Sequence, residues 1–244
     1  IKSKTAFLFP GQGAQYPGMG KDFFNTFAIA KETFQEADDL LQENLSQIIF
    51  DGPEGLLTET RYSQLGIFVT SVAILRTVMQ QMPGIIPFIT AGLSLGEYSA
   101  LYASGKLRFK ETLLLVQKRA LFMNAACEKT NGTMAAVLGM DAAEIEKILQ
   151  ESPEIWIANY NCPGQTVISG TVAGVDAAAR LLKEKGAKRV IPLVVHGAFH
   201  SGLMQSAQES LSPFVLEAPI QDSSIHLVMN VPGKRVDSVE MIKD

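Results

Sequence analysis

The sequence predicts an α/β protein with a parallel-sheet core and an inserted, ferredoxin-like small subdomain. Apolar, β-rich runs alternate with helical stretches through the first half, and a β-α-β-β-α-β order follows from about residue 130 to residue 195. The 244 residues are 47% apolar and 19% charged, which suits one sizeable core with a small lobe. We therefore expect a core made of residues 1–129 and 196–244 and a subdomain made of residues 130–195.

Short apolar runs that end in turns predict the strands of the core, and apolar residues at helical spacing predict its helices. The predicted elements are strand 5–10, helix 21–49, helix 63–81, strand 85–91, helix 97–103 and helix 110–127. The run at 85–91 is apolar, as in a buried strand of a parallel sheet. We expect helices to cover both faces of this sheet.

Turn and capping residues separate the elements of the subdomain. The predicted elements are strand 133–138, helix 141–150, strands 155–159 and 166–169, helix 171–185 and strand 188–195. Asp141 with Glu144 forms a capping-box pattern at the start of the first helix, and Gly186 ends the second. Beyond the subdomain, a strand-like run at 224–229 contains His226, which we interpret as structural.

The charge balance indicates no general attraction to nucleic acid or to an anionic membrane. The 21 basic and 25 acidic residues leave a net charge of −4, so an acidic partner would need a local basic patch. The apolar runs are too short to cross a bilayer and the N-terminus has no signal-peptide pattern, so we expect a cytoplasmic protein. Cys127 and Cys162 have no CxxC spacing and are interpreted as buried thiols, with a catalytic cysteine as the alternative.

A G-x-S-x-G motif at 92–96 is the strongest chemical signal. An apolar run precedes it and a helical run follows, as in the strand-to-helix elbow that presents a serine nucleophile in α/β hydrolases. This context makes Ser94 the candidate nucleophile and the N–H of Leu95 a candidate donor to an oxyanion. The alternative is a glycine-rich turn with an incidental serine.

A serine nucleophile needs a base, and the candidate is a histidine that follows the predicted strand 188–195. His196 and His200 lie on the turn after this strand. Either of them could be the base. The alternatives are a structural histidine or, because the pair stands at i and i+4, metal ligands without a nearby third ligand. We expect no metal.

Two further features indicate substrate binding. Arg119 lies among apolar residues of a predicted helix, where its charge requires an anion, either the carboxylate of a substrate or an internal salt bridge. Lys118 has equally apolar neighbours. The Gly11-Gln12-Gly13 run lacks the third glycine of a dinucleotide site, because Tyr16 occupies that position. We interpret it as a tight turn that brings the N–H of Gln12 toward Ser94, or as a simple βα turn.

Together these motifs resemble the acyltransferase family of fatty-acid and polyketide synthesis, which includes the malonyl-CoA:acyl carrier protein transacylases. The resemblance runs the length of the chain. It rests on FPGQGAQYPGMG at 9–20, GLSLGEYSAL at 92–101, QKRALFM at 117–123, ANYNCPGQTVISG at 158–170 and GAFHSGLM at 197–204.

The resemblance implies a hydrolase-like core and a role for each candidate residue. Ser94 would carry the acyl ester, His200 would be its base and Arg119 would bind the free carboxylate of malonate. Gln12 and Leu95 would supply the oxyanion donors. In this family a phenylalanine just before the catalytic histidine accompanies selection of malonyl over methylmalonyl groups, and Phe199 would have this role. The residues that would line the cleft between the lobes are Asn159, Asn161 and Gln165.

The chain departs from the family at two points. Leu93 stands before the nucleophile, where the family usually has histidine. Family members also continue for several tens of residues beyond the position of Asp244, and that part contains a glutamine-bearing segment near the catalytic histidine.

The predicted function is transfer of a malonyl group from malonyl-CoA to the pantetheine thiol of acyl carrier protein. We expect a monomer that needs no cofactor, since the CoA thioester is a substrate. A basic run provides either a docking patch for the acidic carrier or a solvated helix end, and it consists of Lys183, Lys185, Lys188 and Arg189. The alternatives are a serine esterase or lipase-like hydrolase and a non-catalytic scaffold that binds acyl carrier protein.

Overall fold

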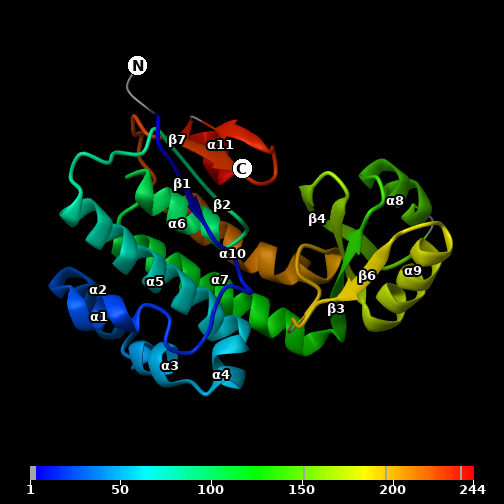
Figure 1. The fold of residues 1–244 in the computed structure, drawn as a ribbon, viewed down its shortest axis with the longest axis horizontal. Helices are drawn as coiled ribbons and strands as arrows, with labels where there is room; N and C mark the ends of the chain where they lie inside the picture. Colours follow the sequence, from blue (N-terminus) through cyan, green and yellow to red (C-terminus); the bar gives the residue numbers. More distant parts are fainter. Residues whose placement is uncertain (1–3, 151, 196, 237) are drawn as a thin grey trace. The chain divides into compact units, whose positions relative to one another are not determined.

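The computed structural model describes residues 4–150, 152–195, 197–236 and 238–244, which form two compact units (Figure 1). The first unit consists of Ile1–Leu121 and Ser212–Asp244, and the second of Phe122–Leu211. The division falls within two helices, α7 (Phe109–Lys129) and α10 (Gln205–Glu217).

A four-stranded sheet in the order β1-β2-β7-β8 forms the centre of the first unit. Its strands are β1 (Ala6–Phe9), β2 (Ile89–Gly92), β7 (His226–Met229) and β8 (Lys234–Val236). The first three pair in parallel, which confirms the predicted parallel core, and β8 runs antiparallel to β7. Because the carboxyl ends of parallel strands meet at one edge, the segments that follow β1, β2 and β7 lie together there.

Most other elements of the first unit are helices, and the predicted helix 21–49 is three helices. The helices of the first unit are α1 (Lys21–Thr26), α2 (Ala28–Leu41), α3 (Leu45–Asp51), α4 (Glu54–Thr58), α5 (Thr60–Gln81), α6 (Gly96–Ala103), the start of α7, the end of α10, and α11 (Val239–Lys243). The long prediction was wrong because Phe27 adopts an extended backbone and Gln42 a left-handed one, and neither continues a helix. Strand β2 starts later than predicted, at Ile89. Pro87 lies just before it and has no N–H for a sheet ladder.

Most of α5 is buried, and the helix crosses the core of the first unit. Contrary to the sequence-based expectation, α5 is long and apolar enough to cross a membrane by composition, the one such helix in the described ranges. Its apolar window is 72% buried inside the protein, as is usual for a core helix. Phe68 of α5 stacks on Phe109 of α7, with ring centroids 5.7 Å apart.

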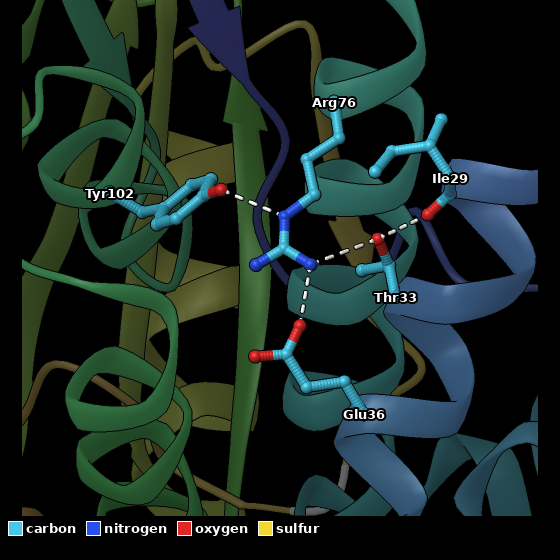
Figure 2. Close-up of polar contacts among 5 residues, drawn as sticks. All are labelled: Ile29, Thr33, Glu36, Arg76 and Tyr102. Carbon is cyan, nitrogen blue, oxygen red and sulfur yellow. Dashed lines mark hydrogen bonds and ion pairs between the residues drawn. The ribbon is translucent and has the colours of Figure 1, made fainter.

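Arg76 links α5 to two neighbouring helices through polar contacts (Figure 2). Its Nε donates to the Tyr102 hydroxyl of α6 at 2.9 Å, and its Nη1 donates to Thr33 Oγ1 at 3.2 Å and to the Glu36 carboxylate at 2.6 Å, both on α2. Thr33 in turn donates to the carbonyl of Ile29 at 2.7 Å. The guanidinium also lies 4.5 Å from the ring centroid of Phe109. The arginine therefore joins three core helices by charge-assisted bonds.

The second unit contains an antiparallel sheet in the order β4-β5-β3-β6, with two helices packed on it. Its elements are the end of α7, β3 (Gly132–Leu138), α8 (Ala142–Leu149), β4 (Ile155–Cys162), β5 (Gln165–Thr171), α9 (Val172–Glu184), β6 (Arg189–Pro192), the 3-10 helix η1 (Gly202–Met204) and the start of α10. This order is the predicted ferredoxin-like arrangement. Ile145, Ile168 and Leu182 are completely buried between sheet and helices. The Asp141 carboxylate caps α8 by accepting from the N–H of Ala143 at 3.0 Å.

Candidate active site

Ser94 lies on a sharp turn between β2 and α6, the strand-to-helix context that the motif predicts. Its φ is 51°, in the left-handed region that a serine rarely adopts. The turn requires two glycines. A Cβ on Gly92 would lie 2.0 Å from the carbonyl carbon and oxygen of Gly96, and a Cβ on Gly96 would lie 2.4 Å from the carbonyl oxygen of Phe9. Strand and helix therefore approach more closely than any side chain permits.

The loop after β1 packs against this turn. The N–H of Leu93 donates to the carbonyl of Phe9 at 3.1 Å, and a Cβ on Gly11 would lie 2.5 Å from the carbonyl oxygen of Leu93. The Gln12 side chain donates to Thr60 Oγ1 at 3.0 Å, which fixes the loop to the start of α5. These contacts hold the backbone of Gly11, the residue before Gln12, against Leu93, the residue before Ser94.

The first amides of α6 are mostly engaged in the turn itself. The N–H groups of Gly96 and Glu97 donate to the carbonyls of Leu93 and Ser94 at 2.8 and 3.1 Å. Leu95 is fully buried, and its own N–H takes no part in these bonds. At a helix N-terminus such an amide carries partial positive charge and suits an oxyanion.

Arg119 of α7 contacts the Ser94 hydroxyl directly. Its Nη2 donates to Ser94 Oγ at 2.9 Å, and its Nη1 donates to Oε1 of Gln64, a fully buried side chain of α5. The guanidinium carbon lies 5.6 Å from the ring centroid of Tyr98. Burial lowers the pKa of Arg119, an effect that the neighbouring Tyr98 and Glu97 oppose.

The salt-bridge alternative for Arg119 is wrong, because among the described residues no carboxylate lies within ion-pair distance of its guanidinium. Lys118, which the sequence could not separate from Arg119, lies instead with its ammonium 4.2 Å from the ring centroid of Phe214. Within the described part of the chain, the partly buried cation beside Ser94 therefore has no contacting counter-ion. Such a site favours an anionic ligand.

Asn230 is a site residue that the sequence reasoning missed. Its Oδ1 accepts from the N–H of Ser94 at 2.6 Å, and its Nδ2 donates to the carbonyl of Gly92 at 2.7 Å. The N–H of Asn230 donates to Oε1 of Glu97 at 2.7 Å. Burial raises the pKa of Glu97, and the bond from Asn230 and the charge of Arg119 oppose this rise. The one available signal was its position directly after the predicted strand 224–229.

In the second unit, a tightly packed turn carries His200. A Cβ on Gly197 would lie 2.3 Å from Sγ of Cys127, so this position accepts only glycine without rearrangement. Ala198 and Phe199 are buried, whereas His200 is exposed with a φ of 57°. Ser201 Oγ closes the turn by donating to the carbonyl of Ala198 at 2.6 Å. The turn therefore presents the imidazole at the surface of its unit.

The metal-ligand alternative for His196 and His200 cannot be followed, since His196 lies outside the described residues. Within the described ranges no group of three or more His, Cys, Asp or Glu side chains is placed to hold a metal ion.

The three polar residues predicted to line a cleft lie on β4 and β5. Nδ2 of Asn161 donates to Oε1 of Gln165 at 2.9 Å, across the turn between these strands. Asn159 follows a register shift in β4, where it pairs with Val167 of β5. The structure therefore brings Asn161 and Gln165 together.

The cysteines differ in exposure. Cys127 is buried as predicted, and burial raises the pKa of its thiol to about 11, which disfavours a thiolate nucleophile. The prediction that Cys162 is buried was wrong, because Cys162 ends β4 next to the exposed turn at Pro163.

Comparison with known proteins places this geometry in a family. Residues 6–240 match the acyl transferase domain family. The malonyl CoA-acyl carrier protein transacylase of Bacillus subtilis (strain 168) is 48% identical over 246 residues, which cover 99% of this chain and 77% of the relative. The enzyme of the same name from Staphylococcus aureus (strain COL) is 38% identical, with 99% and 78% covered.

Solved structures agree. The MCAT crystal structure from Streptococcus pneumoniae has a TM-score of 0.92 and 44% identity, and the match covers 98% of this chain and 78% of that one. A malonyl-transacylase in complex with its type II PKS acyl-carrier protein has a TM-score of 0.93 and 36% identity, with 99% and 79% covered. The elbow, the arginine beside its serine and these matches lead to one conclusion: the chain belongs to the acyl transferase domain family.

Proposed function

We propose that the protein transfers a malonyl group from malonyl-CoA to the pantetheine thiol of acyl carrier protein in fatty-acid biosynthesis, through a malonyl ester on Ser94. One observation carries the choice of acyl group. The guanidinium of Arg119 lies 2.9 Å from Ser94 Oγ and, in the described part of the chain, pairs with no carboxylate. A free carboxylate on the acyl group would supply the missing anion. The relatives named malonyl CoA-acyl carrier protein transacylase support the same assignment.

In the first half-reaction, Ser94 Oγ attacks the thioester carbonyl while His200 accepts the hydroxyl proton. The carbonyl oxygen becomes an oxyanion, for which the N–H groups of Leu95 and Gln12 are the donors. The carbon–sulfur bond then breaks, His200 returns the proton to the sulfur, and CoA leaves. The product is a malonyl ester on Ser94.

The second half-reaction repeats these steps with a different nucleophile. His200 takes the proton of the pantetheine thiol, the sulfur attacks the serine ester, and the proton passes to Ser94 Oγ as the ester bond breaks. Arg119 holds the malonyl carboxylate through both halves. Phe199 is buried next to His200 in the same turn. We propose that its ring favours a malonyl group over the branched methylmalonyl group. The amide side chains of Asn159, Asn161 and Gln165 are proposed to contact the substrate.

The carrier protein would dock on the basic run at the end of α9. The four residues of this run are all exposed: Lys183, Lys185, Lys188 and Arg189. Their charge complements an acidic carrier and would speed its encounter with the enzyme. We further propose that the reaction takes place in the cytoplasm, that the enzyme acts as a monomer, and that it needs no cofactor because the CoA thioester is itself the substrate.

Trapping the acyl-enzyme tests this scheme. Purified protein mixed with malonyl-CoA and quenched in acid should carry one malonyl group, which peptide mass spectrometry should locate on Ser94. Ser94→Ala should carry none, whereas Ser206→Ala, a change at an exposed serine of α10, should be labelled like wild type. A wild-type protein without adduct, or an undiminished adduct in Ser94→Ala, would reject the scheme.

Arg119→Ala separates a malonyl transferase from an esterase of neutral acyl groups. Loss of a charge-assisted contact should lower kcat/KM for malonyl-CoA by about 10- to 150-fold and leave turnover of acetyl-CoA nearly unchanged. Lys118→Ala is the matched control, since Lys118 contacts Phe214 rather than the elbow. Equal losses for both substrates would count against a role in carboxylate recognition.

A further inference from the structure

We propose that Asn230 is a positioning residue that holds the backbone of the nucleophile elbow in its reactive conformation. This inference rests on the role proposed above for Ser94. Asn230 lies 136 residues from Ser94 in the sequence, on the segment that follows β7. Parallel pairing of β2 with β7, with Ala91 opposite Val228, brings that segment to the end of β2 where the elbow begins.

The side-chain amide of Asn230 bonds to both sides of the elbow. Its Oδ1 accepts from the N–H of Ser94 at 2.6 Å and its Nδ2 donates to the carbonyl of Gly92 at 2.7 Å. The two bonds close a ring over the backbone between Gly92 and Ser94. A planar amide suits this task because it carries a donor and an acceptor at a fixed separation.

The elbow needs such support because its conformation is unfavourable. The φ of 51° at Ser94 costs of order 1 kcal/mol for a residue with a Cβ, and the surrounding structure must compensate. Asn230 is itself held by the bond from its N–H to Glu97 in the first turn of α6. Strand, nucleophile and helix thus share one hydrogen-bonded group.

The same bond limits which amides can stabilise an oxyanion. Because the Ser94 N–H already donates to Asn230, the oxyanion donors must come from other residues, as the roles proposed for Leu95 and Gln12 require. Loss of Asn230 would release the Ser94 amide and loosen the direction of the hydroxyl. The affinity of Arg119 for the substrate carboxylate would not change. Asn230 should therefore affect kcat and not KM.

The first test compares Asn230→Ala with wild type in two assays. We expect kcat for malonyl transfer to fall about 10- to 100-fold while KM for malonyl-CoA changes by less than about twofold. The rate at which phenylmethanesulfonyl fluoride modifies Ser94 should fall in parallel, since this small reagent requires the serine but no malonyl site. Control variants are Asn44→Ala, at an exposed asparagine that makes no capping bond, and Val231→Ala, at the fully exposed neighbour of Asn230.

Asn230→Asp provides a second test, the pH dependence of the sulfonylation rate. A residue that only stabilised the fold would not change this pH dependence. Its carboxylate accepts from the Ser94 N–H but cannot donate to the Gly92 carbonyl, and protonation restores that donor. The ratio of variant to wild-type sulfonylation rates should therefore rise as the pH is lowered, whereas the ratio for Asn230→Ala should stay flat. The charged groups near this position, Glu97 on α6 and Arg119 on α7, are present in all three proteins. The carboxylate of Glu97 would raise the pKa of the new acid, and the guanidinium of Arg119 would lower it.

The outcomes separate this inference from the proposed function. Wild-type rates of both reactions in Asn230→Ala, or a flat pH ratio in Asn230→Asp, would overturn the positioning role alone. A wild-type protein that forms no malonyl ester would instead reject the transferase, and the sulfonylation rates would still decide the role of Asn230. If Asn230→Ala does not fold, the pH ratio of Asn230→Asp remains a sufficient test.

Discussion

Gly92→Ala tests the close approach of strand and helix on which the elbow depends. The added methyl group would lie 2.0 Å from the carbonyl carbon and oxygen of Gly96, and 2.6 Å from its Cα. Ordinary contact begins near 3.4 Å, so these atoms would have to separate by roughly 1.4 Å. All are backbone atoms at the start of α6, so no side chain can rotate away.

The cost follows from this geometry. Overpacking in a well-packed core costs about 1–3 kcal/mol, and a clash of backbone with backbone belongs at the upper end of that range. For a protein of this length, about 3 kcal/mol corresponds to a fall in Tm of roughly 6–12 °C. Because α6 follows Ser94 directly, the displacement would also move the nucleophile, and malonyl transfer should fall by at least about tenfold.

Thermal unfolding followed by circular dichroism, together with the transfer assay, would measure both effects. The matched control is Gly55→Ala in α4, where a Cβ would meet nothing within 4 Å. There alanine should stabilise the protein by about 0.5–1 kcal/mol, because it restricts the unfolded chain. A Gly92→Ala protein with wild-type Tm and activity would refute the close packing described above.

Two other predictions concern groups away from the elbow. Arg76→Met should destabilise the protein by about 1–2 kcal/mol in urea unfolding, because it removes the donor to the Tyr102 hydroxyl and to the partly exposed Glu36 carboxylate. The KM for malonyl-CoA should not change. Unchanged stability would contradict the network in Figure 2. Maleimide should label Cys162 rapidly at pH 7. Cys127 should react slowly, since its pKa of about 11 leaves few thiolates, and its rate should rise about tenfold per pH unit below that value. Rapid labelling of Cys127 at pH 7 would contradict its burial.

Local signals made much of the fold predictable. Capping and turn residues mark the ends of the subdomain elements, such as Asp141 at the start of α8 and Pro163 in the turn between β4 and β5. The predicted order of these elements is the observed ferredoxin-like order. The break of helix 21–49 at Phe27 and Gln42 was not predictable, because neither residue type interrupts a helix by itself. Helix α10 was missed as well, since Pro213 inside it argues against a helix.

The site could be predicted only where its functional residues form a motif of consecutive positions. The two glycines around Ser94 indicate an elbow from five consecutive positions. Arg119 and Lys118 have equivalent apolar neighbours, and only tertiary contacts with Gln64 and Phe214 distinguish them. Asn230 bonds to Ser94 across 136 residues, a distance over which helical or strand periodicity carries no information.

The left-handed backbone at Ser94 also has an evolutionary consequence. Four non-glycine residues in the described ranges have a positive φ, and Ser94 and His200 are two of them. Glycine would adopt either conformation without a steric penalty, so replacement by glycine relieves strain and removes the reactive group at the same time. Selection for thermal stability alone would therefore erode this site, and serine and histidine persist at these positions only while the protein is selected for turnover.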